Sequence, residues 1–184
     1  MTAPSHAVLT VRRMSLLIRI SETDRRLLLL LQHSESLLAR FSKGVSRSAD
    51  GPPYLVSGVL IFLLVPEGGR FFAHLMVAFI IERSLYWSLK NTLKRKRPAQ
   101  ALPGFHSQIV AGDEFSLPSG HTSAAFLFVS ILTVHYGFLF LPLYLWSTAV
   151  GFSRVYLGVH YPTDVLVGAL LGSAIAFSTV NVFS

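Results

Sequence analysis

Five apolar stretches with few charges occupy most of residues 53–183, and they limit the fold more than any other feature of the sequence. The stretches cover residues 53–66, 71–89, 119–136, 138–156 and 162–183. A hydrocarbon core about 30 Å thick is crossed by roughly 20 helical residues, so most of these stretches are long enough to span a membrane. We therefore predict an all-α fold, a polytopic transmembrane helical bundle of about five spans.

The composition supports a membrane location. Apolar residues make up 52% of the 184 residues and charged residues only 14%, against about 25% in an ordinary soluble domain. The mean hydropathy is +0.54, and the net charge is +7. These values exclude a disordered chain and a soluble domain for acidic ligands, and no nucleic-acid partner is predicted. The absence of cysteine excludes disulfides, cysteine-ligated metals and a thiol nucleophile.

Residues 1–50 form a basic N-terminal segment that we predict to lie at the membrane interface. Eight Lys and Arg residues leave no uncharged window long enough to span a membrane. Leucines and Phe41 repeat near helical period between residues 27 and 41, which predicts an interfacial amphipathic helix. Asp24 is the predicted N-cap of that helix. Residues 51–184 then form a single transmembrane domain.

The polar residues of this domain fall in three clusters at the ends of the predicted spans. The clusters are Lys90 with Arg97-Pro98, then Pro118-Ser119-Gly120-His121, then Ser153-Arg154 with His160 and Asp164. Two spans separate the second cluster from the third, and no span separates the first from the second. All three clusters are therefore predicted at one membrane face.

Three cations brought together at the edge of an apolar bundle repel one another unless they share an anion. Arg97 and Arg154 offer planar forks that match phosphate oxygens, and Lys90 offers a compact point charge. Ser119 and Gly120 are predicted to add free amides at a helix N-terminus, whose dipole favours an anion. This combination predicts a site for a phosphoryl group.

The third cluster also supplies a histidine and a carboxylate four residues apart. Asp164 is expected to accept a hydrogen bond from one nitrogen of His160, which leaves the other nitrogen free as a nucleophile. Protonated His121 is predicted to act as general acid toward the leaving oxygen and later to activate water. The cations supply the electrostatic stabilisation, so no metal and no cofactor is predicted. The alternative is a metal site formed by His121, His160 and Asp164.

Other polar residues are expected to have structural roles. The remaining histidines are predicted to be solvated or capping residues, although His106 lies in the loop of the site: His6, His33, His74, His106 and His135. Lys94, Arg95 and Lys96 form a basic stretch that is expected to attract anionic lipid headgroups. Glu82 and Arg83, inside the second span, are expected to pair locally.

The three clusters together resemble the tripartite signature of the type 2 phosphatidic acid phosphatase superfamily. The matching motifs are Lys90-x6-Arg97-Pro98, Pro118-Ser119-Gly120-His121 and Ser153-Arg154-x5-His160-x3-Asp164. The resemblance implies a membrane helical bundle that removes phosphate from lipid phosphates or diphosphates without metal. It implies phosphate binding by Lys90, Arg97, Arg154, Ser119 and Gly120, with His121 as acid, His160 as nucleophile and Asp164 as its partner.

The orientation in the membrane stays open. Members of the superfamily commonly have six spans and a site that faces away from the cytoplasm. Five spans instead place the site on the same side as the N-terminus, which its basic residues would keep inside.

The predicted function is that of a lipid phosphatase in the bacterial inner (plasma) membrane, with residues 51–184 as the phosphatase domain. Undecaprenyl diphosphate is the first candidate substrate, followed by phosphatidic acid and phosphatidylglycerol phosphate. Two alternatives are a lipid phosphotransferase that uses the same histidine and a non-catalytic membrane binding protein. The sequence predicts no oligomeric state.

Overall fold

The computed structural model describes residues 6–31 and 37–183, with side chains from residue 19 onward. Within these residues the secondary structure is helical, apart from an isolated antiparallel bridge between Lys96 and Phe115. The elements are α1 (His6–Leu31), α2 (Leu37–Ser48), α3 (Gly51–Leu64), α4 (Gly68–Leu93), α5 (Pro98–Ala101), α6 (Gly120–Tyr136), η1 (Phe138–Phe140), α7 (Leu143–Tyr156) and α8 (Pro162–Val182). The all-α prediction is confirmed.

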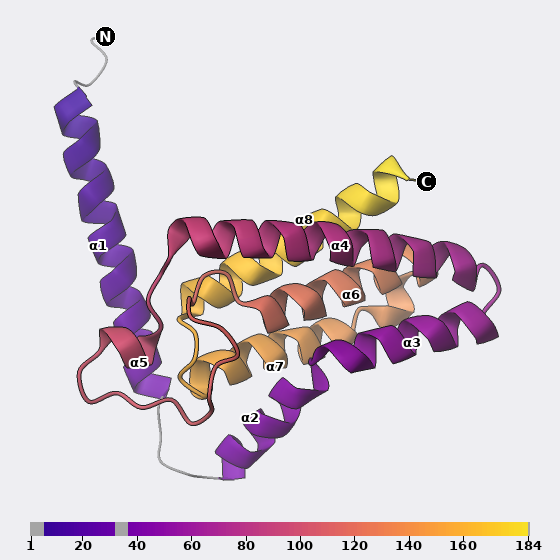
Figure 1. The fold of residues 1–184 in the computed structure, drawn as a ribbon, viewed down its shortest axis with the longest axis horizontal. Helices are drawn as coiled ribbons and strands as arrows, with labels where there is room; N and C mark the ends of the chain where they lie inside the picture. Colours follow the sequence, from indigo (N-terminus) through magenta and orange to yellow (C-terminus); the bar gives the residue numbers. More distant parts are fainter. Residues whose placement is uncertain (1–5, 32–36, 184) are drawn as a thin grey trace.

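Five helices, α3, α4, α6, α7 and α8, lie side by side along the long axis of the molecule (Figure 1). Helix α6 is the centre of this bundle, since it contacts α4, α7 and α8 and is buried over most of its length. Helix α1 projects from one end of the bundle, and α2 packs against α7. The connections between α4 and α6 and between α7 and α8 lie at the same end as α1.

Local sequence explains where the helices end. Gly137 adopts φ +81°, a left-handed conformation that glycine accepts without strain, and it ends α6. The gap between the predicted stretches 119–136 and 138–156 thus falls where α6 ends. Pro142 directly precedes α7. Pro162 begins α8, where its missing amide is not needed, and Asp164 follows within the first turn.

Two helical segments in the described residues are long and apolar enough to cross a membrane by length and composition, Phe138–Tyr156 and Pro162–Val182. Helix α3 is apolar but has only 14 residues, and α6 has 17. Helix α4 has 26 residues but includes the charged pair Glu82 and Arg83. The helices fall close to the predicted stretches, while the count of five spans remains a proposal.

The N-terminal segment differs from its prediction. The helix expected over residues 27–41 corresponds to the end of α1 and the start of α2, and residues 32–36 between them lie outside the described residues. Leu37, Leu38 and Phe41 are exposed on α2, whereas Ala39 is buried, which agrees with an amphipathic helix. The prediction of Asp24 as an N-cap of its own helix is wrong. Asp24 lies inside α1, and its carboxylate reaches the N-terminus of α8.

Small residues allow α6 and α8 to approach closely. A Cβ atom on Gly168 would lie 2.6 Å from the carbonyl oxygen of Ser119, and one on Gly172 would lie 2.1 Å from that of Ser123. Glycines four residues apart on one helix face permit backbone contact between helices, as in membrane helix pairs. This contact fixes the start of α6 against the start of α8, where the predicted site residues lie.

We expect Gly172→Ala to lower the free energy of unfolding by about 1–3 kcal/mol, because the new methyl group forces the α6 backbone away. Thermal unfolding of the purified protein in detergent measures the change. Gly44→Ala on α2 is the matched control, since a Cβ there meets no heavy atom within 4 Å and alanine favours helix. An unchanged melting temperature for Gly172→Ala would contradict the close packing.

Candidate active site

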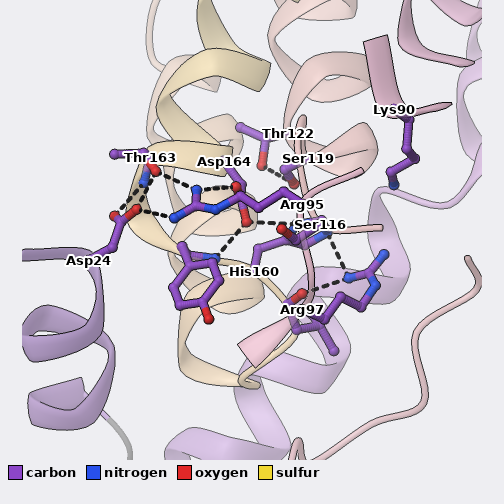
Figure 2. A network of polar contacts seen from close by, with 12 residues as sticks. Asp24, Lys90, Arg95, Arg97, Ser116, Ser119, Thr122, His160, Thr163 and Asp164 are labelled. Carbon is purple, nitrogen blue, oxygen red and sulfur yellow. Dashed lines mark hydrogen bonds and ion pairs between the residues drawn. The ribbon is translucent and has the colours of Figure 1, made fainter. Parts of the chain in front are cut away.

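The predicted site residues come together at one end of the bundle. They come from the C-terminal part of α4, the following linker, the start of α6, the end of α7, the connection between α7 and α8, and the start of α8. Figure 2 shows five of them, Lys90, Arg97, Ser119, His160 and Asp164. Arg97 Nη1 lies 3.4 Å from His160 Nε2, and His160 Nδ1 lies 3.6 Å from Asp164 Oδ2. The three sequence clusters therefore do lie at one end of the bundle, as their spacing predicted.

A cavity of about 450 Å³ opens beside these residues. One part of its wall is polar and includes Arg97, His121, Arg154 and His160. Another part is apolar and aromatic, and it includes Leu55, Met76, Phe79 and Trp87. The cavity therefore suits a ligand with an anionic group and an apolar portion.

His160 is held as a neutral imidazole with a defined tautomer. Guanidinium nitrogens only donate hydrogen bonds, so Nε2, which faces Arg97 Nη1, is the acceptor and carries the lone pair. The proton is then assigned to Nδ1, which faces Asp164 Oδ2 at 3.6 Å. Nδ1 has no hydrogen-bond partner among the described residues, so the two groups lie at ion-pair distance and the predicted hydrogen bond is not formed. Burial lowers the pKa of His160 to about 4. Asp164 offsets part of the effect of burial, and the nearby Arg154 and Arg97 add to it.

Asp164 is buried and fully engaged. Its Oδ2 accepts the backbone N–H of Tyr161 at 2.8 Å, as expected for an acidic residue in the first turn of a helix. Its Oδ1 accepts a hydrogen bond from Arg95 Nη1 at 2.6 Å. Arg95 therefore pairs with a carboxylate of the site, which corrects its assignment to lipid headgroups. For Lys94 and Lys96 that assignment stays a prediction.

Asp113, in the loop between α5 and α6, is a site residue that the sequence analysis missed. Lys90 Nζ lies 2.6 Å and Arg97 Nη2 lies 2.5 Å from its Oδ1. The hydroxyl of Tyr86 donates to Oδ2 at 2.6 Å. Burial by itself raises the pKa of Asp113, but the hydrogen bonds from Lys90, Tyr86 and Arg97 outweigh it and lower the pKa to about 2. The anion that these two cations need is supplied by the chain itself.

Arg154 approaches the cavity from α7. Its Nη1 donates to Ser46 Oγ of α2 at 2.6 Å, while its Nε is buried and has no hydrogen-bond partner among the described residues. A buried guanidinium N–H without an acceptor is costly, so an anionic ligand in the cavity would satisfy it.

His121 has an acidic partner from outside the predicted clusters. Its Nε2 lies 3.0 Å from Oδ1 of Asp50, the residue directly before α3. Both side chains remain accessible, and both line the cavity. A carboxylate oxygen only accepts, so the contact with Asp50 assigns a proton to Nε2 of His121.

The structure separates the two residues whose backbone amides were predicted to bind an anion at the start of α6, Ser119 and Gly120. The amide of Ser119 donates to the carbonyl oxygen of Asp164 at 3.0 Å, so the prediction that it is free for an anion is wrong. Gly120 begins α6 and lines the cavity. A Cβ at Gly120 would lie 2.9 Å from the ring of Tyr86, so only glycine fits here.

The remaining predictions concern residues around the site. Glu82 and Arg83 form the expected local ion pair, and Arg83 also lines the cavity. His74 and His135 pair with each other at 2.9 Å, and His74 also contacts the carbonyl oxygen of Phe183 at the end of α8.

Three other histidines lie outside the clusters. His106 is exposed in the loop between α5 and α6. For His33 and the side chain of His6, the structural role predicted lies outside the described residues. In the part of the chain that is described, His, Asp and Glu side chains form no group of three placed to hold a metal ion. The alternative of a metal site at His121, His160 and Asp164 thus has no geometric support, because His121 pairs with Asp50 instead.

Comparison with known proteins identifies the family. The family model described as PAP2 superfamily matches residues 71–184. The chain belongs to the PAP2 superfamily. The matched region contains every predicted site residue from Lys90 to Asp164, whereas Ser46 and Asp50 precede it.

Curated proteins with known names are similar to this chain. Undecaprenyl-diphosphatase of Sulfolobus acidocaldarius is 34% identical over 60% of this chain and 54% of its own length. Phosphatidylglycerophosphatase B of Bacillus subtilis is 32% identical over 66% of each chain. The chain thus spans between about half and two thirds of the length of these curated relatives.

Two solved structures share the fold. The crystal structure of Aquifex aeolicus LpxE matches with a TM-score of 0.75 and 28% identity, covering 85% of this chain and 93% of LpxE. The transmembrane PAP2 type phosphatidylglycerolphosphate phosphatase from Bacillus subtilis matches with a TM-score of 0.72 and 25% identity, covering 90% and 86%.

The Asp113 contacts generate a test of the site. Asp113→Asn is expected to lower the free energy of unfolding by about 1–3 kcal/mol, because Lys90 and Arg97 lose a compensating charge. Inorganic phosphate should then stabilise the variant more than the parent, since it returns an anion to the two cations. Thermal unfolding in detergent, with and without phosphate, measures both effects. The exposed neighbour Glu114 provides the control Glu114→Gln, and equal phosphate responses in parent and Asp113→Asn would contradict this role.

Proposed function

We propose that this chain is an integral membrane lipid phosphatase that hydrolyses a lipid phosphate or diphosphate through a phosphohistidine at His160. The observation that carries the proposal is the position of the buried imidazole of His160. Its Nε2 lone pair lies beside Arg97, and the cavity that it lines also has an apolar wall. A nucleophile beside a cationic oxygen-binding group is the arrangement that phosphoryl transfer requires.

The reaction follows from these positions. The Nε2 lone pair of His160 attacks phosphorus, the bond from phosphorus to the lipid oxygen breaks, and that oxygen takes the electron pair. His121, protonated and paired with Asp50, donates its proton to the departing oxygen. Water then attacks the phosphohistidine, gives a proton to His121, and releases phosphate as the N–P bond breaks.

The proposed phosphate site consists of Arg97, Arg154 and the amide of Gly120, and Lys90 joins it when Asp113 gives way to the substrate. The unpartnered Nε of Arg154 supports this assignment, because it is a buried donor at the edge of the cavity. Asp164 orients His160 through its Nδ1. Ser119 has a structural role in this proposal. Its backbone amide donates a hydrogen bond to the carbonyl oxygen of Asp164, which connects the start of α6 to α8.

The substrate class is proposed from the cavity and from the relatives. The apolar wall is suited to the first part of a lipid chain, while the cations are suited to its phosphate or diphosphate group. The relatives include an undecaprenyl-diphosphatase and a phosphatidylglycerophosphatase. We propose undecaprenyl diphosphate first, followed by phosphatidic acid and phosphatidylglycerol phosphate.

The proposed location is the bacterial inner membrane, with α3, α4, α6, η1–α7 and α8 as five spans. Large apolar side chains face outward along the bundle, including Leu63 and Leu64 on α3 and Leu166 and Leu170 on α8. An outer surface of this kind is stable in lipid and unfavourable in water.

The proposal predicts different behaviour for the two histidines. His160→Ala should form no phosphoenzyme from any substrate, because it lacks the nucleophile. His121→Ala should form and accumulate phosphohistidine from an activated aryl phosphate, whose leaving group needs little protonation. Rapid quench with radiolabelled aryl phosphate, followed by alkaline treatment that preserves phosphohistidine, measures both. Radioactive label in the His160→Ala protein would reverse the assignment of nucleophile and acid.

The substrate class has a separate test. The parent protein is assayed with a panel of lipid phosphates and diphosphates, and the phosphate released from each is measured.

The pH dependence provides a further test. The pKa of His160 is lowered to about 4, so Nε2 keeps its lone pair above that value and loses it as the pH falls through 4. The acid limb of kcat/KM for an aryl phosphate, corrected for the titration of the substrate, should therefore lie near 4. A limb near 6.5, the ordinary value for histidine, would contradict the buried neutral nucleophile.

A further inference from the structure

A buried carboxylate of the N-terminal helix lies at the start of α8. Asp24, on α1, is 1% exposed. Its Oδ1 accepts the backbone N–H of Thr163 at 3.0 Å, and its Oδ2 accepts the Thr163 hydroxyl. The first amides of a helix have no partner within the helix, so a carboxylate from α1 takes the place of an N-cap for α8.

The Asp24 carboxylate also pairs with Arg95, which in turn pairs with Asp164, the residue beside His160. Arg95 Nη2 lies 2.6 Å from Asp24 Oδ2, and its Nη1 lies 2.6 Å from Asp164 Oδ1 (Figure 2). The guanidinium lies over the ring of Tyr161 at 4.3 Å, and Nη1 also donates to the Thr163 hydroxyl. Arg95 is thereby fixed between two carboxylates, one of which contacts His160.

We propose that Asp24 is a positioning residue for the nucleophile, acting through Arg95 on Asp164, an inference that rests on the proposed role of His160. Asp24 precedes the region matched by the family model and lies in a segment to which the sequence analysis gave only an interfacial role. Leu28, one turn further along α1, is fully buried in a cluster with Phe105, Val155 and Tyr161, so α1 is packed against this end of the bundle.

The charges explain why a second carboxylate is needed. The positive charge of Arg95 opposes the electrostatic effect of the Asp164 carboxylate on His160. Without a second anion, Arg95 would therefore weaken the interaction of Asp164 with His160. Asp24 supplies a second anion that compensates the guanidinium, so the Asp164 carboxylate keeps its electrostatic interaction with Nδ1 of His160. Asp24 also fixes the first turn of α8, on which Asp164 lies.

Charged groups face His160 from three elements. Asp164 lies on α8, Arg97 in the linker after α4, and Arg154 on α7, while Arg95 is on the far side of Asp164. When Arg95 loses its charge, the Asp164 carboxylate interacts more strongly with His160, and the protonated form of His160 becomes more stable. When Asp24 loses its charge, Arg95 is less compensated, and the protonated form of His160 becomes less stable. The two substitutions therefore shift the acid limb of kcat/KM in opposite directions, which a purely structural anchor would not do.

The test compares Asp24→Asn, Arg95→Gln and the double variant in the full-length protein, assayed with an aryl phosphate. We expect each single substitution to lower kcat roughly 10- to 100-fold with little change in KM, since it displaces a reacting group by a fraction of an ångström. The double variant should be no slower than Arg95→Gln alone, because Asp24 acts through Arg95. The acid limb should move to higher pH in Arg95→Gln and to lower pH in Asp24→Asn.

Glu22→Gln is the matched control, because Glu22 is an exposed acidic residue of the same helix that pairs only with the exposed Arg26 in the described residues. It should leave kcat and the acid limb unchanged. The melting temperatures of all variants are measured in parallel. If Asp24→Asn fails to fold, the acid limb of Arg95→Gln decides, and an unshifted limb overturns the proposal.

The outcomes separate this inference from the proposed function. A parent protein that forms no phosphohistidine at His160 refutes the proposed function. A parent protein that forms it, with Asp24→Asn indistinguishable from Glu22→Gln, refutes the role of Asp24 alone. The role of Asp24 is also refuted if the fold-decrease in kcat of the double variant equals the product of the decreases in the two single variants. That result would show that Asp24 and Arg95 act independently.

Discussion

The need to compensate buried positive charge determines the arrangement of this site. Lys90, Arg97 and Arg154 are each no more than 6% exposed, so water screens their mutual repulsion only weakly. The three cations are compensated in two ways. Lys90 and Arg97 share the carboxylate of Asp113, while Arg154 has a hydroxyl partner and one unpaired N–H. A substrate phosphate would complete this arrangement, and Asp113 is the internal anion that it has to displace.

The same principle extends to the side of His160 that faces away from Arg97. Asp164 is buried, and Arg95 compensates it, while Arg95 in turn is shared with Asp24. The result is an alternating row of negative and positive groups that ends at a neutral imidazole. A histidine kept neutral by burial and flanking arginines is available as a nucleophile without prior loss of a proton.

The N-terminal segment is part of this site. Asp24 on α1, Ser46 on α2 and Asp50 before α3 contact, respectively, Arg95, Arg154 and His121. These three residues precede the region matched by the PAP2 family model, so contacts from outside that region reach the proposed site. Exposed leucines on α2 are compatible with a second role for the same segment at the lipid surface.

Sequence alone determined the helical class, the approximate bounds of α3, α4, α6 and α8, and the gathering of the three motif clusters at one end, because hydrophobic length and motif spacing are local properties of the chain. It did not determine the partners of those residues. Asp24 and Arg95 are 71 positions apart, as are Asp50 and His121, and Ser46 and Arg154 are separated by 108. No periodicity or spacing rule connects such pairs. Only the tertiary structure decided these contacts. The packing of α1 and α2 against the bundle brings Asp24, Ser46 and Asp50 to Arg95, Arg154 and His121, respectively. The contact between α6 and α8 brings the amide of Ser119 to the carbonyl oxygen of Asp164.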